Sequence, residues 1–109
     1  MSRDPAPRPT TYIEAVAEEI HRRLPAGVTS PDRDRGLYLL YAVLALTVGE
    51  RVTREDVHDA WAAWMVLQGS SHSALRPFRE LPAEEQERDE PFRKAIQEVA
   101  RMHARQRRG

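Results

Sequence analysis

The sequence predicts an all-α domain, a compact bundle of four main helices with an ordered, proline-containing loop between the third and the fourth. Apolar residues recur at spacings of three and four in several segments. These segments are bounded by residues that typically begin or end helices. The longest apolar run, residues 37–46, is rich in Leu and Ala, which favours a buried helix over a buried strand.

Length and composition are typical of one small domain. With 109 residues, 40% of them hydrophobic and 31% charged, the chain can bury one core and cover it. The absence of cysteine excludes disulfides and thiolate chemistry, and it suits a reducing compartment. No apolar run reaches the ~20 residues of a membrane span, and the N-terminus resembles no secretory signal. We therefore expect a soluble, cytoplasmic protein without membrane contact.

The first helix is predicted to begin at Thr10 or Thr11 and to end before Pro25. Either threonine can cap a helix, and Glu14 follows Thr11 at the spacing of a capping box. Proline breaks a helix interior because it lacks the backbone N–H. The face expected to point inward carries Tyr12, Ile13, Val16, Ala17, Ile20 and Leu24.

The second helix is predicted over roughly residues 34–48. Ser30, just ahead of Pro31, gives a start signal in the preceding loop. Apolar residues surround most of the helix circumference, so we expect this helix to be the buried centre of the bundle. Gly49 follows as the expected C-cap, because glycine readily adopts the left-handed conformation.

The third helix is predicted to begin after Thr53, with Asp56 at the capping position, and to end at Gly69. We expect Trp61 to pack in the core and Trp64 to lie either in the core or at its rim. The predicted inward stripe consists of Val57, Ala60, Trp61, Trp64, Met65 and Leu67 or Gln68.

The loop over residues 70–80 carries apolar side chains that a fully solvated loop would not need. We therefore expect Leu75, Pro77 and Phe78 to pack down on the helices. The acidic residues 82–90 predict a short turn or helix. Pro91 suits the first turn of the last helix, whose apolar residues are Phe92, Ile96, Val99, Ala100 and Met102.

A ligand-binding surface is the first candidate site, because indole rings and guanidinium groups can stack on and clamp a planar or phosphorylated ligand. In this interpretation His58, Trp61, Trp64, His72 and Arg76 form a pocket. In the alternative the tryptophans fill the core and His58 lies on the surface beside Asp59. The residues that we favour for the ligand surface are Trp64, His72, Arg76, Phe78 and Arg79.

Nucleic-acid binding is disfavoured. The formal net charge is +0, and the first turn of the third helix, the recognition helix of a helix–turn–helix, carries mostly carboxylates. Basic residues at the end of the last helix also suit the helix dipole. If the chain touches nucleic acid at all, the expected contacts are the C-terminal Arg101, Arg105, Arg107 and Arg108.

We expect neither a metal, nor a cofactor, nor catalysis. His58 and His72 are not at a recognised ligand spacing, and His21 and His103 are expected alone on helix surfaces. No glycine-rich phosphate loop occurs, and nothing in the pattern pairs a nucleophile with a base.

Residues 57–99 resemble the ryanodine-receptor repeat, a small helical module also found in bacteria and phages. The matching pieces are VHDAW, HSALRPFREL and EEQERDEPFRKAI, with a shortened segment, MVLQGSS, between the first two. The whole chain also resembles small actinobacterial and actinophage proteins that share this short segment and form a domain of unknown function. The resemblance implies binding of nucleotide-like small molecules or protein partners, without catalysis. The residues that fit the repeat pattern are His58, Trp61, His72, Leu75, Pro77, Phe78, Leu81, Asp89, Arg93 and Ile96.

These observations divide the chain into a flexible arm (1–10), a single helical domain (11–104) and a basic tail (105–109). The leading hypothesis is a non-enzymatic module that binds a nucleotide-like small molecule or a protein segment, with the acids of 82–90 setting partner specificity. The alternative is an interaction subunit that forms a homodimer or binds a partner protein. Nucleic-acid binding through the C-terminal arginines is less favoured.

Overall fold

The fold was analysed in a computed structural model, which describes residues 11–25, 27 and 34–108. Within these residues the protein is all-α, as predicted, with four longer helices and one short one. The predicted arm (1–10) and the start signal at Ser30 lie outside the described residues. The helices are α1 (Tyr12–Arg22), α2 (Arg35–Thr47), α3 (Arg54–Leu67), the short α4 (Ala83–Glu87) and α5 (Glu90–Arg108), with 3-10 turns η1 (Gly49–Arg51) and η2 (Phe78–Glu80).

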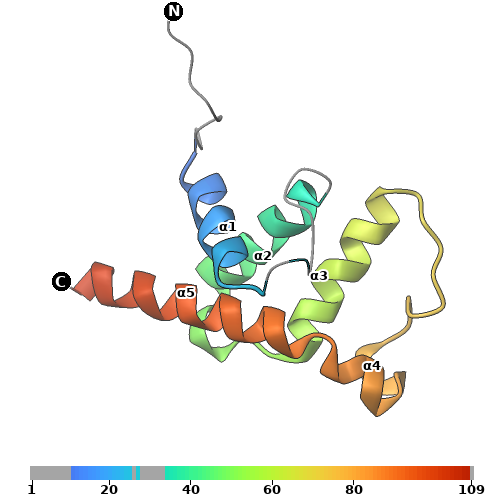
Figure 1. The fold of residues 1–109 in the computed structure, drawn as a ribbon. Coiled ribbons are helices and arrows are strands. Elements are labelled where there is room, and N and C mark those ends of the chain that lie inside the picture. Colours follow the sequence, from blue (N-terminus) through green and yellow to red (C-terminus); the bar gives the residue numbers. More distant parts are fainter. Residues whose placement is uncertain (1–10, 26, 28–33, 109) are drawn as a thin grey trace, which may run out of the picture.

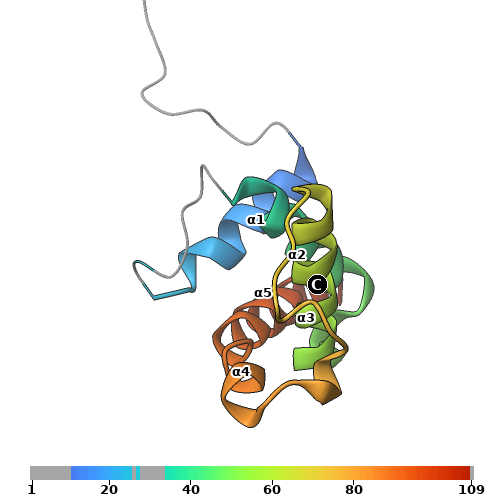
Figure 2. The same ribbon diagram turned by 90° about the vertical axis from the view of Figure 1, so that its right-hand side faces the viewer.

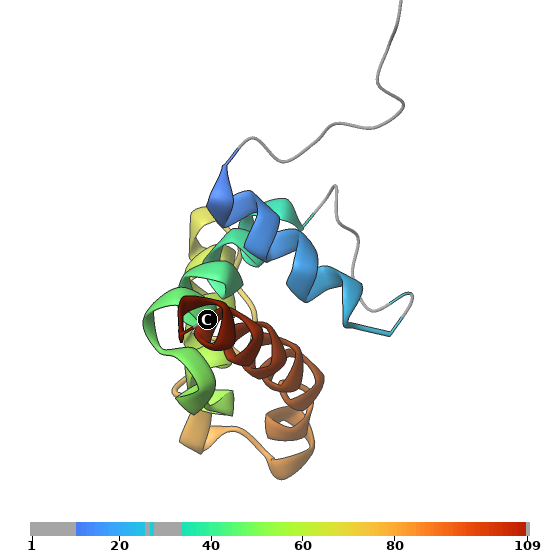
Figure 3. The ribbon, with the colours of Figure 1, turned by 90° about the vertical axis from the view of Figure 1, so that its left-hand side faces the viewer.

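Helices α1 and α3 both pack against the central pair formed by α2 and α5. Helix α2 contacts α1, α3 and α5, and α5 also contacts α1 and η1 (Figure 1). Figure 2 shows the loop after α3 returning along that helix to α4, which precedes α5. Figure 3 looks along α5 from its C-terminal end, with α1 and α2 on one side of it. No described helix is both long and apolar enough to cross a bilayer.

Helix α1 begins at Thr11, whose hydroxyl accepts a hydrogen bond from the backbone N–H of Glu14 at 3.1 Å. Its buried face consists of Val16, Ala17 and Ile20. The expectation for Tyr12 is wrong, because this side chain is 72% exposed. Tyr12 is the first residue of the helix, and packing against the core starts only at the next residue, Ile13.

Helix α2 is the central helix of the bundle, although it is not buried on every side. Val43 is 42% exposed, so one strip of the helix reaches solvent. Tyr38 and Tyr41 face the core, and the ring of His21 contacts that of Tyr38 at a centroid distance of 5.2 Å. The expectation that His21 stands alone on a helix surface is therefore wrong. The buried residues of α2 are Leu37, Tyr38, Tyr41, Ala42 and Ala45.

Helix α3 begins with the predicted capping box. The backbone N–H of Asp56 donates to the Thr53 hydroxyl at 3.1 Å, and the N–H of Thr53 donates to the Asp56 carboxylate at 2.9 Å. The inward stripe ends earlier than predicted, because Leu67 is 76% exposed and Gln68 is exposed as well. Figure 1 shows the last turn of α3 extending away from α5 toward the loop, so the described helices leave this turn uncovered.

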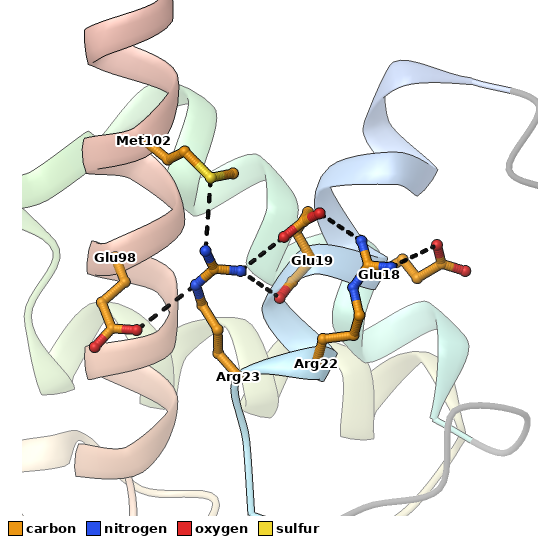
Figure 4. A network of polar contacts seen from close by, with 6 residues as sticks. All are labelled: Glu18, Glu19, Arg22, Arg23, Glu98 and Met102. Carbon is orange, nitrogen blue, oxygen red and sulfur yellow. Dashed lines mark hydrogen bonds and ion pairs between the residues drawn. The ribbon is translucent and has the colours of Figure 1, made fainter.

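A polar network joins α1 to α5 on the outside of the bundle (Figure 4). The guanidinium of Arg23 lies 2.7 Å from the Glu19 carboxylate on its own helix and 3.6 Å from that of Glu98 on α5. It also contacts the sulfur of Met102 at 3.5 Å. The network lies beside the contact between α1 and α5. The buried residues of α5 are Ala95, Ile96, Val99 and Ala100.

Candidate functional site

A cavity of about 300 Å³ lies between the start of α2, α3, the loop before η2 and the start of α5. This volume is at the lower end of the range of ligand pockets. Six of the lining side chains carry aromatic rings, and most of the others are charged. The rings come from α2 (Tyr41), α3 (His58, Trp61, Trp64), the loop (His72) and α5 (Phe92).

The two tryptophans form one wall of the cavity, and both are partly buried against the core. The ring of His72 stands edge-on to Trp61 at a centroid distance of 5.4 Å. Gly36 allows Trp64 to lie close to α2, since a Cβ atom at Gly36 would be 3.2 Å from two atoms of the indole. The prediction of Trp64 at the rim of the core is compatible with this position, and the importance of Gly36 was not predicted.

His58 holds the loop against α3. Its side chain is only 3% exposed, and Nε2 lies 2.7 Å from the backbone carbonyl oxygen of Arg76. Because a carbonyl oxygen only accepts, Nε2 carries the hydrogen. The ring also contacts those of Trp61 and Phe78, at centroid distances of 5.5 Å and 6.0 Å. The alternative in which His58 lies on the surface beside Asp59 is therefore wrong, because the loop folds back over it.

Only part of the predicted ligand surface lines this cavity. Trp64 and His72 do, whereas Arg76, Phe78 and Arg79 do not. Phe78 packs on the ring of His58, and Arg76 contributes its backbone carbonyl while its side chain is exposed. The side chain of Arg79 is 83% exposed and lies 3.9 Å from the Glu55 carboxylate. The two guanidinium groups predicted to clamp a ligand are therefore not part of the cavity lining.

The charged groups of the cavity are mainly acidic. Among the described lining residues, Asp34, Glu85 and Asp89 supply three carboxylates and Arg88 supplies the one guanidinium. Asp34, at the start of α2, is 6% exposed. Burial raises the pKa of Asp89 to about 6, although the charges of His58 and Arg54 partly oppose this shift.

Sequence reasoning did not identify Asp34 or Asp89 as cavity residues. The sequence nevertheless contains a signal for them. Asp34 stands three residues before the buried Leu37, and Asp89 stands three residues before the partly buried Phe92. Residues three apart on a helix share a face.

Tyr41 lines the same cavity, and its pKa is raised above the ordinary value. Burial is the main cause, and the negative charges of Asp89 and Asp34 and the phenol of Tyr38 add to it.

Beside the cavity, Glu90 neutralises two arginines. Its Oε1 accepts hydrogen bonds from the Nε atoms of Arg54 and Arg93, each at 2.8 Å, and Oε2 accepts one from Arg93 at 2.7 Å. These bonds lower the pKa of Glu90 to about 2, despite partial burial. Neither arginine lines the cavity. The positive charges of Arg54, at the start of α3, and Arg93, near the start of α5, are both paired with Glu90.

The predicted nucleic-acid contacts lie elsewhere, at the C-terminal half of α5. A groove of about 410 Å³ there includes Arg101 and Arg105 together with Arg23 and Glu98. Arg101 is paired with Glu50 at 3.2 Å. The helix continues to Arg108, and the side chains of Arg107 and Arg108 lie outside the described part of the structure.

A family model matches residues 11–101, from the cap of α1 well into α5. The chain belongs to the family described as domain of unknown function DUF7701. No curated protein and no solved structure matches it significantly. The DUF7701 region contains every residue that lines the aromatic cavity and extends beyond residues 57–99, the part that resembles the ryanodine-receptor repeat. This match carries no ryanodine-receptor name, so that resemblance stays a hypothesis.

Proposed function

We propose that this DUF7701 domain is a non-enzymatic binding module whose ligand occupies the aromatic cavity. The observation that carries the proposal is the convergence of six aromatic rings from four segments on a space of about 300 Å³. Concave, aromatic-lined pockets with a few polar groups are the usual form of small-molecule sites. The volume suits one planar or side-chain-sized group, belonging either to a small molecule or to a protein segment.

The hypothesis of a nucleotide-like ligand takes a narrower form here. A base can stack on the indoles. Its phosphates, however, would meet a lining in which the described residues supply three carboxylates and one cationic side chain, Arg88. A planar group without phosphate is therefore favoured.

A binding role is favoured over catalysis because His58, the buried imidazole of the cavity lining, has a structural function. His58 donates its Nε2 hydrogen to the loop carbonyl of Arg76 and packs between Trp61 and Phe78. The Nε2 atom is therefore committed to the loop and not to a ligand. A cytoplasmic location is part of the same proposal, based on the absence of cysteine.

The alternative, an assembly of identical chains or with a partner protein, is favoured by one observation. Val66 and Leu67, adjacent at the end of α3, are 66% and 76% exposed. Sedimentation equilibrium tests this alternative, because a dimer that uses this end should dissociate in the variant Leu67→Glu. A monomer at micromolar concentration counts against an obligate oligomer. Nucleic-acid binding is less favoured, since Arg23 and Arg101 are paired with glutamates.

A thermal-shift screen tests the binding proposal, with a panel of neutral, cationic and anionic planar compounds. A ligand at about 100 times its Kd stabilises the fold by ~2.7 kcal/mol. The variant Ala74→Phe fills the cavity from the loop, while Ser71→Phe adds the same ring at an exposed loop position outside the cavity. A shift that is lost in Ala74→Phe and kept in Ser71→Phe supports the proposal. No shift across the panel, or one that survives in Ala74→Phe, contradicts it.

A further inference from the structure

We propose that the aromatic cavity recognises an organic cation, so that the group entering it is a guanidinium or an alkylammonium. This inference rests on the proposed function, because it names the chemical class of the ligand of the same cavity. Three features of the cavity support it, namely the sign of the lining charges, the aromatic rings beside those charges and the positions of the neighbouring arginines.

The lining charges surround the cavity with carboxylates from three segments. Asp34 precedes α2, Glu85 lies on α4 and Asp89 lies between α4 and α5. Arg88, the one cationic side chain among the described lining residues, is exposed to solvent. A ligand with a positive charge would meet the carboxylates of Glu85 and Asp89, whereas an anion would have to be desolvated beside these like charges.

The aromatic rings supply the second requirement. The face of an indole attracts a cation within ~6 Å, and guanidinium groups also stack flat on it. Trp61 and Trp64 lie on one helix at a spacing of three, and Tyr41 and Phe92 contact each other at a centroid distance of 5.6 Å. Rings combined with carboxylates bind both the apolar stem and the charged end of such a group.

The neighbouring arginines do not convert the cavity into an anion site. Arg54 and Arg93 are hydrogen-bonded to Glu90, and Arg79 is exposed outside the cavity. A metal ion is disfavoured as the cation, since no three His, Asp or Glu side chains in the described parts are grouped closely enough to hold one.

The ionisation of Asp89 gives the inference a pH dependence. The positive charges of His58 and Arg54 on α3 only partly offset the effect of burial on its pKa. The other titratable or charged groups of the same lining are Asp34, Tyr41, Glu85 and Arg88. With the pKa at about 6, the carboxylate is ionised at pH 7.5 and largely protonated at pH 5. Cation binding is therefore expected to weaken as the pH falls through 6.

A fluorescence titration with two matched probes tests the inference. Trp61 and Trp64 are the two tryptophans of the chain and both line the cavity, so emission reports directly on its occupancy. N-acetyl-arginine amide and N-acetyl-citrulline amide have nearly the same shape, but only the first is charged. We expect the arginine probe to bind at least ~10-fold more tightly, as is typical when a buried charge pair is formed. Agmatine and an arginine-containing tripeptide then distinguish a free amine from a peptide side chain as the source of the group.

The variant Asp89→Asn keeps the shape of the side chain and removes its charge. It should weaken binding of the arginine probe by about 10-fold and leave the citrulline probe unchanged. The control Glu84→Gln makes the same charge change at an exposed α4 residue outside the cavity and should weaken neither probe. Equal weakening in both variants would show a general field effect and overturn the inference.

The other outcomes separate this inference from the proposed function. If the citrulline probe or adenosine monophosphate binds as tightly as the arginine probe, the cavity is a binding site but the inference is overturned. If N-acetyl-arginine amide, agmatine and the arginine-containing tripeptide all fail to bind up to millimolar concentration, the inference is overturned whatever the neutral compounds do. The proposed function itself falls only when the full thermal-shift panel gives no cavity-dependent response.

Discussion

His58 and Arg76 are joined by a hydrogen bond of 2.7 Å between the imidazole Nε2 and the backbone carbonyl oxygen. The bond spans 18 residues and ties the loop to the middle of α3. Because His58 is also 3% exposed, the bond lies where water cannot easily replace it. His58 therefore helps to hold the loop wall of the cavity, which carries His72 and Ala74, together with the ring contact between His72 and Trp61.

We expect His58→Ala to destabilise the fold by about 2–4 kcal/mol, because it leaves a space in the core and a carbonyl without its partner. Arg76→Ala should cost no more than about 0.5 kcal/mol, since only the backbone of this residue makes the bond. Urea denaturation of both variants measures the difference. Similar losses in the two variants would mean that the side chain of Arg76 also holds the loop.

The tryptophan wall gives a second contrast along one helix. Trp61→Ala should lower the free energy of unfolding by about 2–4 kcal/mol. This loss is below the largest losses for Trp→Ala changes because the indole is only partly buried. Leu67→Ala, six residues further, should change the free energy of unfolding by less than about 0.5 kcal/mol, because its side chain is 76% exposed. A neutral Trp61→Ala would show that the cavity wall does not support the core.

Asp89→Asn is expected to stabilise the protein at neutral pH. The folded pKa of Asp89 is raised to about 6, against ~4 in an unfolded chain, so the folded state holds the proton more tightly. The resulting penalty is absent below pH ~4, grows between pH ~4 and 6 and is constant above. The free energy of unfolding, measured by urea denaturation, should be about 1–3 kcal/mol higher in the variant than in wild type at pH 7 and nearly equal at pH 4. An advantage of equal size at both pH values would contradict the burial of this carboxylate.

Glu90→Gln should show the opposite sign. The pKa of Glu90 is lowered to about 2 by Arg93 and Arg54, so its stabilising contribution is complete above pH ~4 and is lost as the pH falls toward 2. The side chains of Glu90 and Arg54 are 30% and 39% exposed, so we expect a loss of only about 1 kcal/mol at pH 7. Thermal melts at pH 7 and pH 3 measure it, with Glu87→Gln on α4 as the exposed control. A loss that persists undiminished at pH 3 would show that the ion pairs are not its source.

Much of the fold could be predicted because its signals are local. The cap at Thr11, the capping box between Thr53 and Asp56 and the left-handed glycines after α2 and α3 each depend on a few neighbouring residues. The point at which a helix stops packing against the core could not be predicted from neighbouring residues in the sequence. The exposure of Leu67 follows from the end of its helix lying uncovered, which no periodicity within the helix indicates.

The site could be predicted only in part, for the same reason. Trp64 and His72 were identified from their residue types, and both line the cavity. The burial of His58 depends on a loop 18 residues away. Arg76 and Arg79 were predicted to lie on the ligand surface, but the direction of their side chains is set by the path of that loop. Asp34 and Asp89 meet at the cavity only through the packing of α2 against α5.

The most direct test of the central claim is the position of the two indole N–H resonances during ligand titration. Both indoles line the cavity, so the account predicts that the signals of Trp61 and Trp64 shift together with one Kd when the arginine probe or a screening hit is added. The same ligand should leave both signals in place in Ala74→Phe. Unchanged indole signals, with shifts confined to backbone amides at the C-terminal half of α5 or at Val66 and Leu67, would contradict the account.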